Sequence, residues 1–279
     1  MFYSPKDINS LIDILNGDLE NTYVISGGTD LIIGLRNKKI TDYSIIDITK
    51  LSDYKGIRED QENIYIGALT TMTEIAEDSI IDSNLRALKC AAYNLGSEII
   101  RNKATIGGNI ANAAQCADTV LALFAFDAEV VLISPRGERT MRIDEVVVGI
   151  NRTTIKKDEI IAKIIVKKNE RISAFQKLGS RKAVTISKIS CAVNLLMDQD
   201  KVESARVFLG AVGIKPVRAQ LLESLFTNVK ISEIKLKEFQ KTAYDEVELA
   251  IPDRSSKYYK RIAIKAVIDD ILKDLINYE

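Results

Sequence analysis

Residues 104–118 form the stretch of sequence that most restricts how this chain can fold. They are mainly glycine, alanine and asparagine, with few large apolar side chains to bury. We expect a connection of about 15 residues, and connections of that length in compact domains usually bind something. Gly107 and Gly108 would let the backbone approach a ligand closely, and Asp118 would accept hydrogen bonds from ligand hydroxyls. A plain glycine-rich connection, with Asp118 capping the next helix, explains this stretch equally well.

A second glycine pair, Gly27 and Gly28, lies between a predicted strand at residues 22–26 and a short apolar run at residues 31–35. Adjacent glycines allow backbone N–H groups to surround an anion, so this pair is compatible with a diphosphate cradle. A tight turn is the commoner explanation of two adjacent glycines. The segment matches neither a Walker A loop nor a GxGxxG fingerprint.

The composition excludes several kinds of chemistry. The chain has no histidine, which rules out Ser-His-Asp hydrolysis and His-ligated zinc. Cys90, Cys116 and Cys191 are too scattered for a disulfide framework or a metal knuckle, although Cys116 lies in the small-residue stretch and would face a ligand there. We therefore expect no catalytic and no metal-ligating side chains.

Charge and hydropathy restrict the setting of the chain. Lys+Arg and Asp+Glu both number 39, so bulk charge favours neither a nucleic acid nor a membrane as partner. The N-terminus does not resemble a secretory signal, and no apolar run approaches the roughly 18 residues of a membrane span. These features predict a cytoplasmic protein.

Hydrophobic periodicity predicts an α+β protein. The first helix is expected to begin with Ser4 as N-cap and Pro5 as its first residue. Further strands are predicted at residues 43–48, 54–58, 63–67, 129–134, 138–142, 159–166, 172–178, 190–197 and 205–212. Further helices are predicted at residues 71–76, 84–95, 119–126, 219–226, 231–247 and 256–276.

Five motifs, in this order, resemble the FAD-binding subunits of molybdenum hydroxylases, the xanthine dehydrogenase family. They are VISGGTDL at residues 24–31, IGALTT at 66–71, TIGGNIANA with a following AD at 105–118, FQKLGSR at 175–181 and DRSSKYYKR at 253–261. The third is the most specific, and the resemblance spans nearly the whole chain. The chain departs from many relatives at Ala114-Gln115, where those have Ser-Pro, so the local shape there stays open.

The resemblance implies a two-subdomain FAD-binding fold of the vanillyl-alcohol-oxidase (PCMH-type) superfamily, followed by an α+β C-terminal domain. The implied boundaries are residues 1–55, 56–168 and 169–279. The motifs imply FAD contacts for these residues: Val24, Ile25, Ser26, Gly27, Gly28, Thr29, Asp30, Leu31, Thr105, Ile106, Gly108, Asn109, Asn112, Asp118, Ile161 and Lys177. The resemblance would place Lys177 beside the flavin ring. From spacing alone, Lys177 and Arg181 are more commonly part of a solvated basic turn.

The resemblance also implies an oxidoreductase function. The chain would accept electrons from the [2Fe–2S] centres of a small partner subunit, which receives them from a molybdopterin-binding large subunit. It would pass them through FAD to an acceptor such as NAD+, within a heterotrimer or a dimer of heterotrimers. Two alternatives stay open: a stand-alone flavin-dependent dehydrogenase or oxidase with its own substrate, and a flavin-less assembly subunit.

Overall fold

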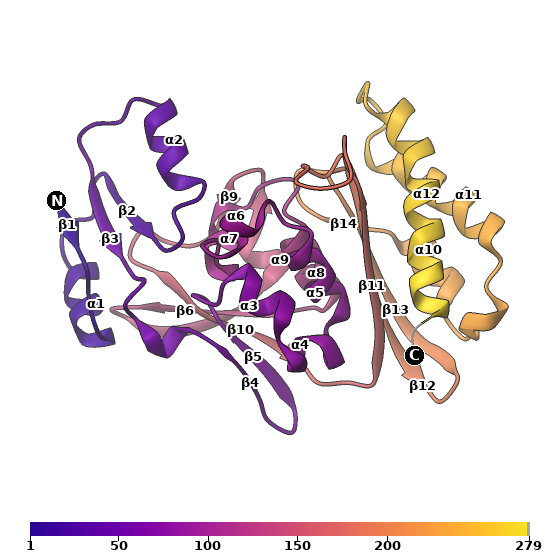
Figure 1. The fold of residues 1–279 in the computed structure, drawn as a ribbon, viewed down its shortest axis with the longest axis horizontal. Coiled ribbons are helices and arrows are strands. Elements are labelled where there is room, and N and C mark those ends of the chain that lie inside the picture. Colours follow the sequence, from indigo (N-terminus) through magenta and orange to yellow (C-terminus); the bar gives the residue numbers. More distant parts are fainter. Residues whose placement is uncertain (278–279) are drawn as a thin grey trace.

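Three main sheets follow one another along the chain and are arranged in succession across the molecule (Figure 1). The computed structural model describes residues 1–277, so residues 278–279 at the end of the predicted third domain lie outside the described residues. A helical layer lies between the second and third sheets, and the C-terminal helices cover the opposite, outer face of the third sheet. The predicted α+β class is confirmed by this arrangement.

The first sheet is parallel, in the order β1-β3-β2. Its first helix begins at Ile8 because Asp7 and Ser10 form a capping box, in which the Asp7 carboxylate accepts from the Ser10 N–H at 2.8 Å. The prediction that Ser4 is the N-cap was therefore wrong. The elements are β1 (Phe2–Tyr3), α1 (Ile8–Leu15), β2 (Thr22–Ile25), α2 (Leu31–Asn37) and β3 (Ser44–Asp47).

The second sheet is antiparallel, in the order β4-β5-β10-β6-β7. A 3-10 turn at Ser52–Tyr54 delays β4, which begins later than the predicted strand at residues 54–58. The strands are β4 (Ile57–Glu59), β5 (Asn63–Gly67), β6 (Glu129–Ser134), β7 (Gly137–Arg142) and β10 (Ile160–Lys167). The intervening elements are α3 (Met72–Glu77), α4 (Ser79–Asn84), α5 (Arg86–Tyr93), α6 (Glu98–Arg101), α7 (Ile106–Asn112), α8 (Asp118–Ala125), α9 (Ile143–Val146), β8 (Val147–Gly149) and β9 (Arg152–Thr153).

Both faces of the second sheet are covered. Alternate residues of β5, Ile64 and Ile66, are fully buried against the helical layer that contains α3, α5 and α8. The opposite face contributes Val131, Ile133 and Ala162 to a core shared with α1 and β3. Burial of alternate strand residues on opposite faces therefore joins the first two sheets. Each of the three sheets together with its helices is called a unit below, and the units are numbered in chain order, so that the third is the C-terminal unit.

The third sheet is antiparallel, in the order β11-β12-β13-β14. The predicted helix at residues 231–247 is interrupted: Ile231–Glu233 is a 3-10 turn, and Ile231 and Ile234 pack on the core through an extended segment before α11 starts. The elements are β11 (Arg171–Leu178), β12 (Ile189–Asp198), β13 (Lys201–Gly210), β14 (Val217–Arg218), α10 (Gln220–Phe226), α11 (Leu236–Ala250) and α12 (Lys257–Ile276).

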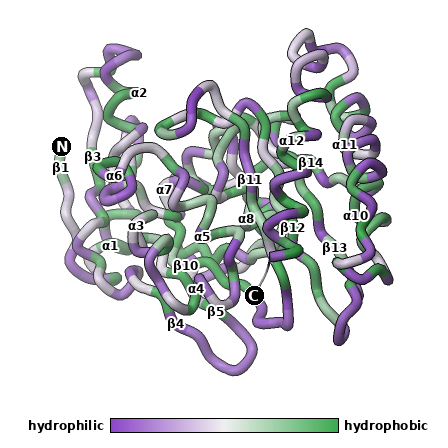
Figure 2. Tube along the Cα trace, turned by 45° about the vertical axis from the view of Figure 1, so that its right-hand side comes forward, coloured by the Kyte–Doolittle hydropathy of each residue, from purple (hydrophilic) through white to green (hydrophobic). Residues whose placement is uncertain are grey.

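The third sheet has helices on both sides. Residues of β12 alternate between a core shared with α11 and α12 and a core shared with α5 and α8, so nearly the whole strand is buried. Hydrophobic residues are concentrated in these inner strands, whereas the turn between β4 and β5 is hydrophilic (Figure 2). No helix within residues 1–277 combines the length and apolar character needed to cross a membrane.

A row of polar side chains on adjacent strands faces the ends of α5 and α8. Ser173, Asn194 and Arg206 are register neighbours on β11, β12 and β13. The Ser173 hydroxyl accepts from the Ala87 N–H at 3.2 Å, near the start of α5. Asn194 and Arg206 donate to carbonyls in the last turn of α8 at 3.2 and 3.3 Å. The row thus provides partners for the Ala87 N–H and the Ala125 carbonyl, and a further donor for the Phe124 carbonyl, which also accepts from the Asp127 N–H.

We predict that Asn194→Ala lowers the free energy of unfolding by about 1–3 kcal/mol, because the buried Ala125 carbonyl loses its side-chain donor. Chemical denaturation measures this change. Ser204→Ala, at an exposed position of the same sheet, serves as the control and should change stability by less than about 0.5 kcal/mol. Equal stability of Asn194→Ala and the control would contradict the role given to the polar row.

Candidate functional site

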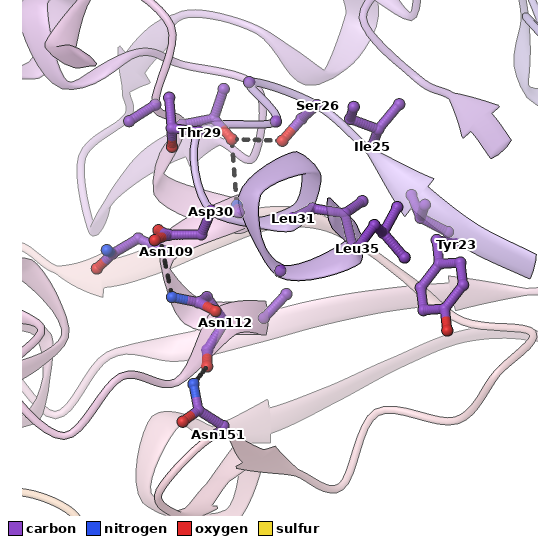
Figure 3. A pocket seen from close by; sticks show the side chains of 18 of the residues that line it. Tyr23, Ile25, Ser26, Thr29, Asp30, Leu31, Leu35, Asn109, Asn112 and Asn151 are labelled. Carbon is purple, nitrogen blue, oxygen red and sulfur yellow. Dashed lines mark hydrogen bonds between the residues drawn. The ribbon is translucent and has the colours of Figure 1, made fainter. Parts of the chain in front are cut away.

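A cavity of about 580 Å³ lies where the segment between β2 and α2 meets α6 and α7. Its wall combines residues of the first unit with residues of the second, and Figure 3 shows side chains from both around the opening. The lining residues are Tyr23, Val24, Ile25, Ser26, Gly27, Gly28, Thr29, Asp30, Leu31, Gly34, Leu35, Lys38, Ile40, Leu95, Ile100, Ala104, Thr105, Gly108, Asn109, Ala111, Asn112 and Asn151.

The first glycine segment turns the chain sharply between β2 and α2. Gly28 has a φ of +66°, a left-handed conformation that glycine adopts without strain. A Cβ on Gly27 would collide with the carbonyl group of Lys103, so glycine is required for the two backbones to meet. Within residues 1–277, the N–H groups of Gly27, Gly28, Thr29 and Asp30 donate no hydrogen bond. These donors are available on the cavity wall.

The second glycine segment is largely helical. The expectation of one long connection was wrong, because Thr105 caps the short helix α7 by accepting from the Gly108 N–H at 3.1 Å. Ile106 is fully buried, which gives the helix an inner face despite its small residues. A Cβ on Gly107 would lie 2.7 Å from the Cβ of Ala68, so this glycine permits α7 to pack closely on the end of β5.

Polar side chains connect the two glycine segments. The Ser26 and Thr105 hydroxyl oxygens are 2.9 Å apart and share a hydrogen bond. Asn112 donates its side-chain amide to the Asp30 carboxylate at 3.3 Å. The Asn109 side-chain oxygen accepts from the Thr119 hydroxyl at 2.7 Å, and within residues 1–277 its NH₂ group has no acceptor. The arrangement leaves amide and hydroxyl groups facing a preformed space.

The structure gathers most of the predicted contact residues around one cavity. Every predicted residue in the range 24–31 lines it, as do Thr105, Gly108, Asn109 and Asn112. Four predicted residues do not line it. They are Ile106 and Ile161, which are buried in the core behind the wall, and Asp118 and Lys177, which form an ion pair elsewhere.

Asp118 and Lys177 form a nearly buried ion pair between the start of α8 and the end of β11. Lys177 Nζ lies 2.9 Å from Asp118 Oδ2 and also donates to the Asn94 carbonyl at 2.9 Å, next to the cavity-lining Leu95. Ser187 donates its hydroxyl to Asp118 at 2.6 Å. Burial raises the pKa of the Asp118 carboxyl, and the Lys177 cation opposes that rise. Asp118 therefore does not cap α8 with its side chain.

Two further candidates have local roles. Arg181 donates to the Val184 carbonyl within its own exposed loop. Cys116 is half-buried and does not line the cavity, and burial together with the Asp118 carboxylate raises the pKa of its thiol. A raised thiol pKa disfavours the nucleophilic thiolate, so the structure gives Cys116 no reactive character.

Sequence reasoning missed part of the cavity wall. The missed residues are Tyr23, Gly34, Leu35, Lys38, Ile40, Leu95, Ile100, Ala104, Ala111 and Asn151. Helical spacing from Leu31 would have indicated Leu35 and Lys38, since residues four and seven apart share a helix face. Leu95, Ile100 and Asn151 reach the cavity through long-range packing, for which the local sequence carries no signal.

We predict that Lys177→Met lowers the free energy of unfolding by about 3–5 kcal/mol at neutral pH, because Asp118 keeps a buried charge without its cation. The Asp118 pKa in the folded variant then lies further above its unfolded value. The loss of unfolding free energy caused by Lys177→Met therefore grows as pH rises through the folded-state pKa of Asp118. It shrinks at low pH, where the carboxyl is protonated in both the folded and the unfolded state. Urea denaturation across pH measures it, and Asp118→Leu/Lys177→Met should recover most of the loss. Equal losses in the single and double variants would contradict the prediction.

Comparisons with known proteins identify the family of the chain. Residues 1–167 match the family model described as the FAD binding domain in molybdopterin dehydrogenase, and residues 173–275 match the CO dehydrogenase flavoprotein C-terminal domain. The nicotinate dehydrogenase FAD-subunit of Eubacterium barkeri is 31% identical, covering 99% of this chain and 96% of the relative. The xanthine dehydrogenase FAD-binding subunit of Escherichia coli O157:H7 is 29% identical, covering 99% and 96%.

Solved structures share the fold. A carbon monoxide dehydrogenase from Hydrogenophaga pseudoflava matches with a TM-score of 0.85 and 24% identity, over 99% of this chain and 96% of that chain. Quinoline 2-oxidoreductase from Pseudomonas putida 86 matches with a TM-score of 0.85 and 18% identity, over 98% and 95%. The predicted PCMH-type fold is confirmed. With two family models covering most of its length, the chain belongs to the FAD-binding subunits of the molybdenum hydroxylase family of dehydrogenases.

Proposed function

We propose that this chain binds one FAD in the cavity between the two glycine segments and relays electrons through it within a larger molybdenum-dependent enzyme. The observation that carries the proposal is the meeting of two glycine segments, from different units, around unpaired backbone N–H groups. Family membership supports the same cofactor.

The residues of the cavity fit FAD. The cavity volume of about 580 Å³ lies within the roughly 300–1,000 Å³ typical of ligand sites. Consecutive backbone N–H groups bind anions, so residues 27–30 suit the diphosphate. The free NH₂ group of Asn109 and the hydroxyl of Thr29 suit the hydroxyls of a sugar or ribityl chain. Tyr23, Leu35 and Ile40 offer apolar surface for a flat ring.

The predicted contact residues divide into two groups. Direct contacts are proposed for the lining residues Val24, Ile25, Ser26, Gly27, Gly28, Thr29, Asp30, Leu31, Thr105, Gly108, Asn109 and Asn112. Ile106 and Ile161 would support the wall from the core. The Lys177–Asp118 pair would fix the third sheet against α8 and hold Asn94 in place beside the cavity.

Bound FAD would supply the redox chemistry, taking up electrons singly and releasing two together. The side chains of this chain would bind, orient and desolvate the cofactor, and none is needed as a general acid or base. That division of tasks agrees with a sequence that contains no histidine.

The partner subunits are inferred from the names of similar proteins. Similar proteins are named medium chains, among them that of carbon monoxide dehydrogenase from Hydrogenophaga pseudoflava. By analogy, electrons would come from a [2Fe–2S] small subunit and a molybdopterin-binding large subunit. They would leave to an acceptor such as NAD+.

We predict that the purified chain contains FAD at close to one per chain, measured by absorption and by chromatography of the chromophore released with acid. Gly27→Ala should reduce the FAD content to below about a tenth, because its Cβ forces the two segments apart. Gly17→Ala, a glycine exchange outside the cavity wall, is the control and should retain FAD. A colourless wild-type chain that takes up no added FAD would overturn the proposal.

A second prediction concerns the relay in the assembled complex. With Gly27→Ala in this chain, substrate-dependent NAD+ reduction should fall to background, while substrate still reduces the [2Fe–2S] centres, as followed by electron paramagnetic resonance. The Gly17→Ala complex should behave as wild type. Undiminished NAD+ reduction in a complex without flavin would show that electrons bypass this chain.

A further inference from the structure

Asn151 lies at the turn of the β8–β9 hairpin and on the edge of the cavity (Figure 3). Its φ of +49° is left-handed, a conformation that asparagine tolerates better than most residues. None of the motifs that indicated the site contains it. Its position nevertheless places two donors against the end of α7.

Asn151 caps the C-terminal end of α7. Its backbone N–H donates to the Ala113 carbonyl at 2.9 Å, and its side-chain amide donates to the Asn112 carbonyl at 2.9 Å. The last carbonyls of a helix lack partners within the helix, so a donor from elsewhere fixes where the helix ends. Ala113 is itself left-handed, with a φ of +47°. One hairpin residue thus holds the end of the helix that carries Asn112.

Asn112 continues the connection to the first glycine segment. Its side-chain amide donates to the Asp30 carboxylate at 3.3 Å, while its carbonyl is held by Asn151. Figure 3 shows Asn112 between Asp30 and Asn151. Three segments that are distant in sequence are therefore linked through these two hydrogen bonds of Asn112 and the bond from the Asn151 N–H to the Ala113 carbonyl.

We propose that Asn151 is a positioning residue for FAD: it fixes the orientation of Asn112 and, through the bond to Asp30, the separation of the two cavity walls. The inference rests on the proposed function and deepens it. Loss of the Asn151 amide frees the backbone of Asn112, so the Asn112 side chain no longer holds Asp30 in place, and the two walls have to be ordered when the cofactor binds. Ordering that accompanies binding weakens affinity.

Two substitutions test the proposal without a change of backbone conformation. Asn151→Gly keeps the left-handed turn and removes the amide, whereas Asn151→Asp keeps the shape and replaces the donor with an acceptor. The matched control is Asn228→Asp, since Asn228 is also left-handed, with a φ of +63°, but lies in the C-terminal unit away from the cavity. The Kd for FAD is measured by fluorescence titration of the apo chain, and thermal unfolding of the apo chain is recorded in parallel.

Both Asn151 variants should raise the Kd for FAD by about tenfold, the effect of one lost hydrogen bond, while the control stays within about twofold. A merely structural role would lower the apo unfolding temperature and leave the Kd of the folded chain unchanged. That result, or equal Kd values in all variants, would overturn the proposal.

A double-variant cycle tests whether Asn151 acts through Asn112. In an Asn112→Ala background, Asn151→Gly should have little further effect on the Kd, because the groups belong to one connection. A full tenfold effect in that background would contradict the proposed connection. Failure of the wild-type chain to bind FAD would instead overturn the proposed function itself, and the wild-type titration identifies that case first.

Discussion

The structure depends on close backbone contact at two glycines. Gly27 lies against the Lys103 carbonyl, and Gly107 lies against Ala68, at distances that leave no room for a Cβ. The first contact joins the loop after β2 to the segment before α7, and the second joins α7 to the end of β5. Together they place both walls of the cavity. The close approach is possible because Gly27 and Gly107 have no side chain. Side-chain hydrogen bonds, such as that between Ser26 and Thr105, then hold the segments together.

The third unit is fixed to the helical layer by polar groups set among apolar ones. The row formed by Ser173, Asn194 and Arg206 pairs with the ends of α5 and α8, and the Lys177–Asp118 ion pair lies between β11 and α8. A buried ion pair adds little net stability, since desolvation offsets most of the attraction. Its geometric demands are strict, however, so the pair restricts how the end of β11 can lie against the start of α8.

Features that depend on local chemistry could be predicted from the sequence, and features that depend on distant partners could not. The glycine pairs and the β6–β7 hairpin follow from short-range patterns, whereas residues 24–31 are assigned to the site through the resemblance of their motif to a known family. Ser4 was mistaken for the cap because Asp7 gains a reciprocal bond with Ser10 that spacing does not reveal. Residues 104–118 look like a loop because the groups that stabilise α7, among them Ala68 and Asn151, lie elsewhere in the chain.

The wall of the cavity is discontinuous in the sequence: it draws on residues between 23 and 40 and then on residues between 95 and 151. During synthesis on the ribosome, the first wall is finished long before the second exists. If FAD binds between these two walls, as proposed, its loading would wait until more than half of the chain has emerged. Until then, the first glycine segment has no opposing surface, so insertion of the proposed FAD would be a late event in the maturation of this protein.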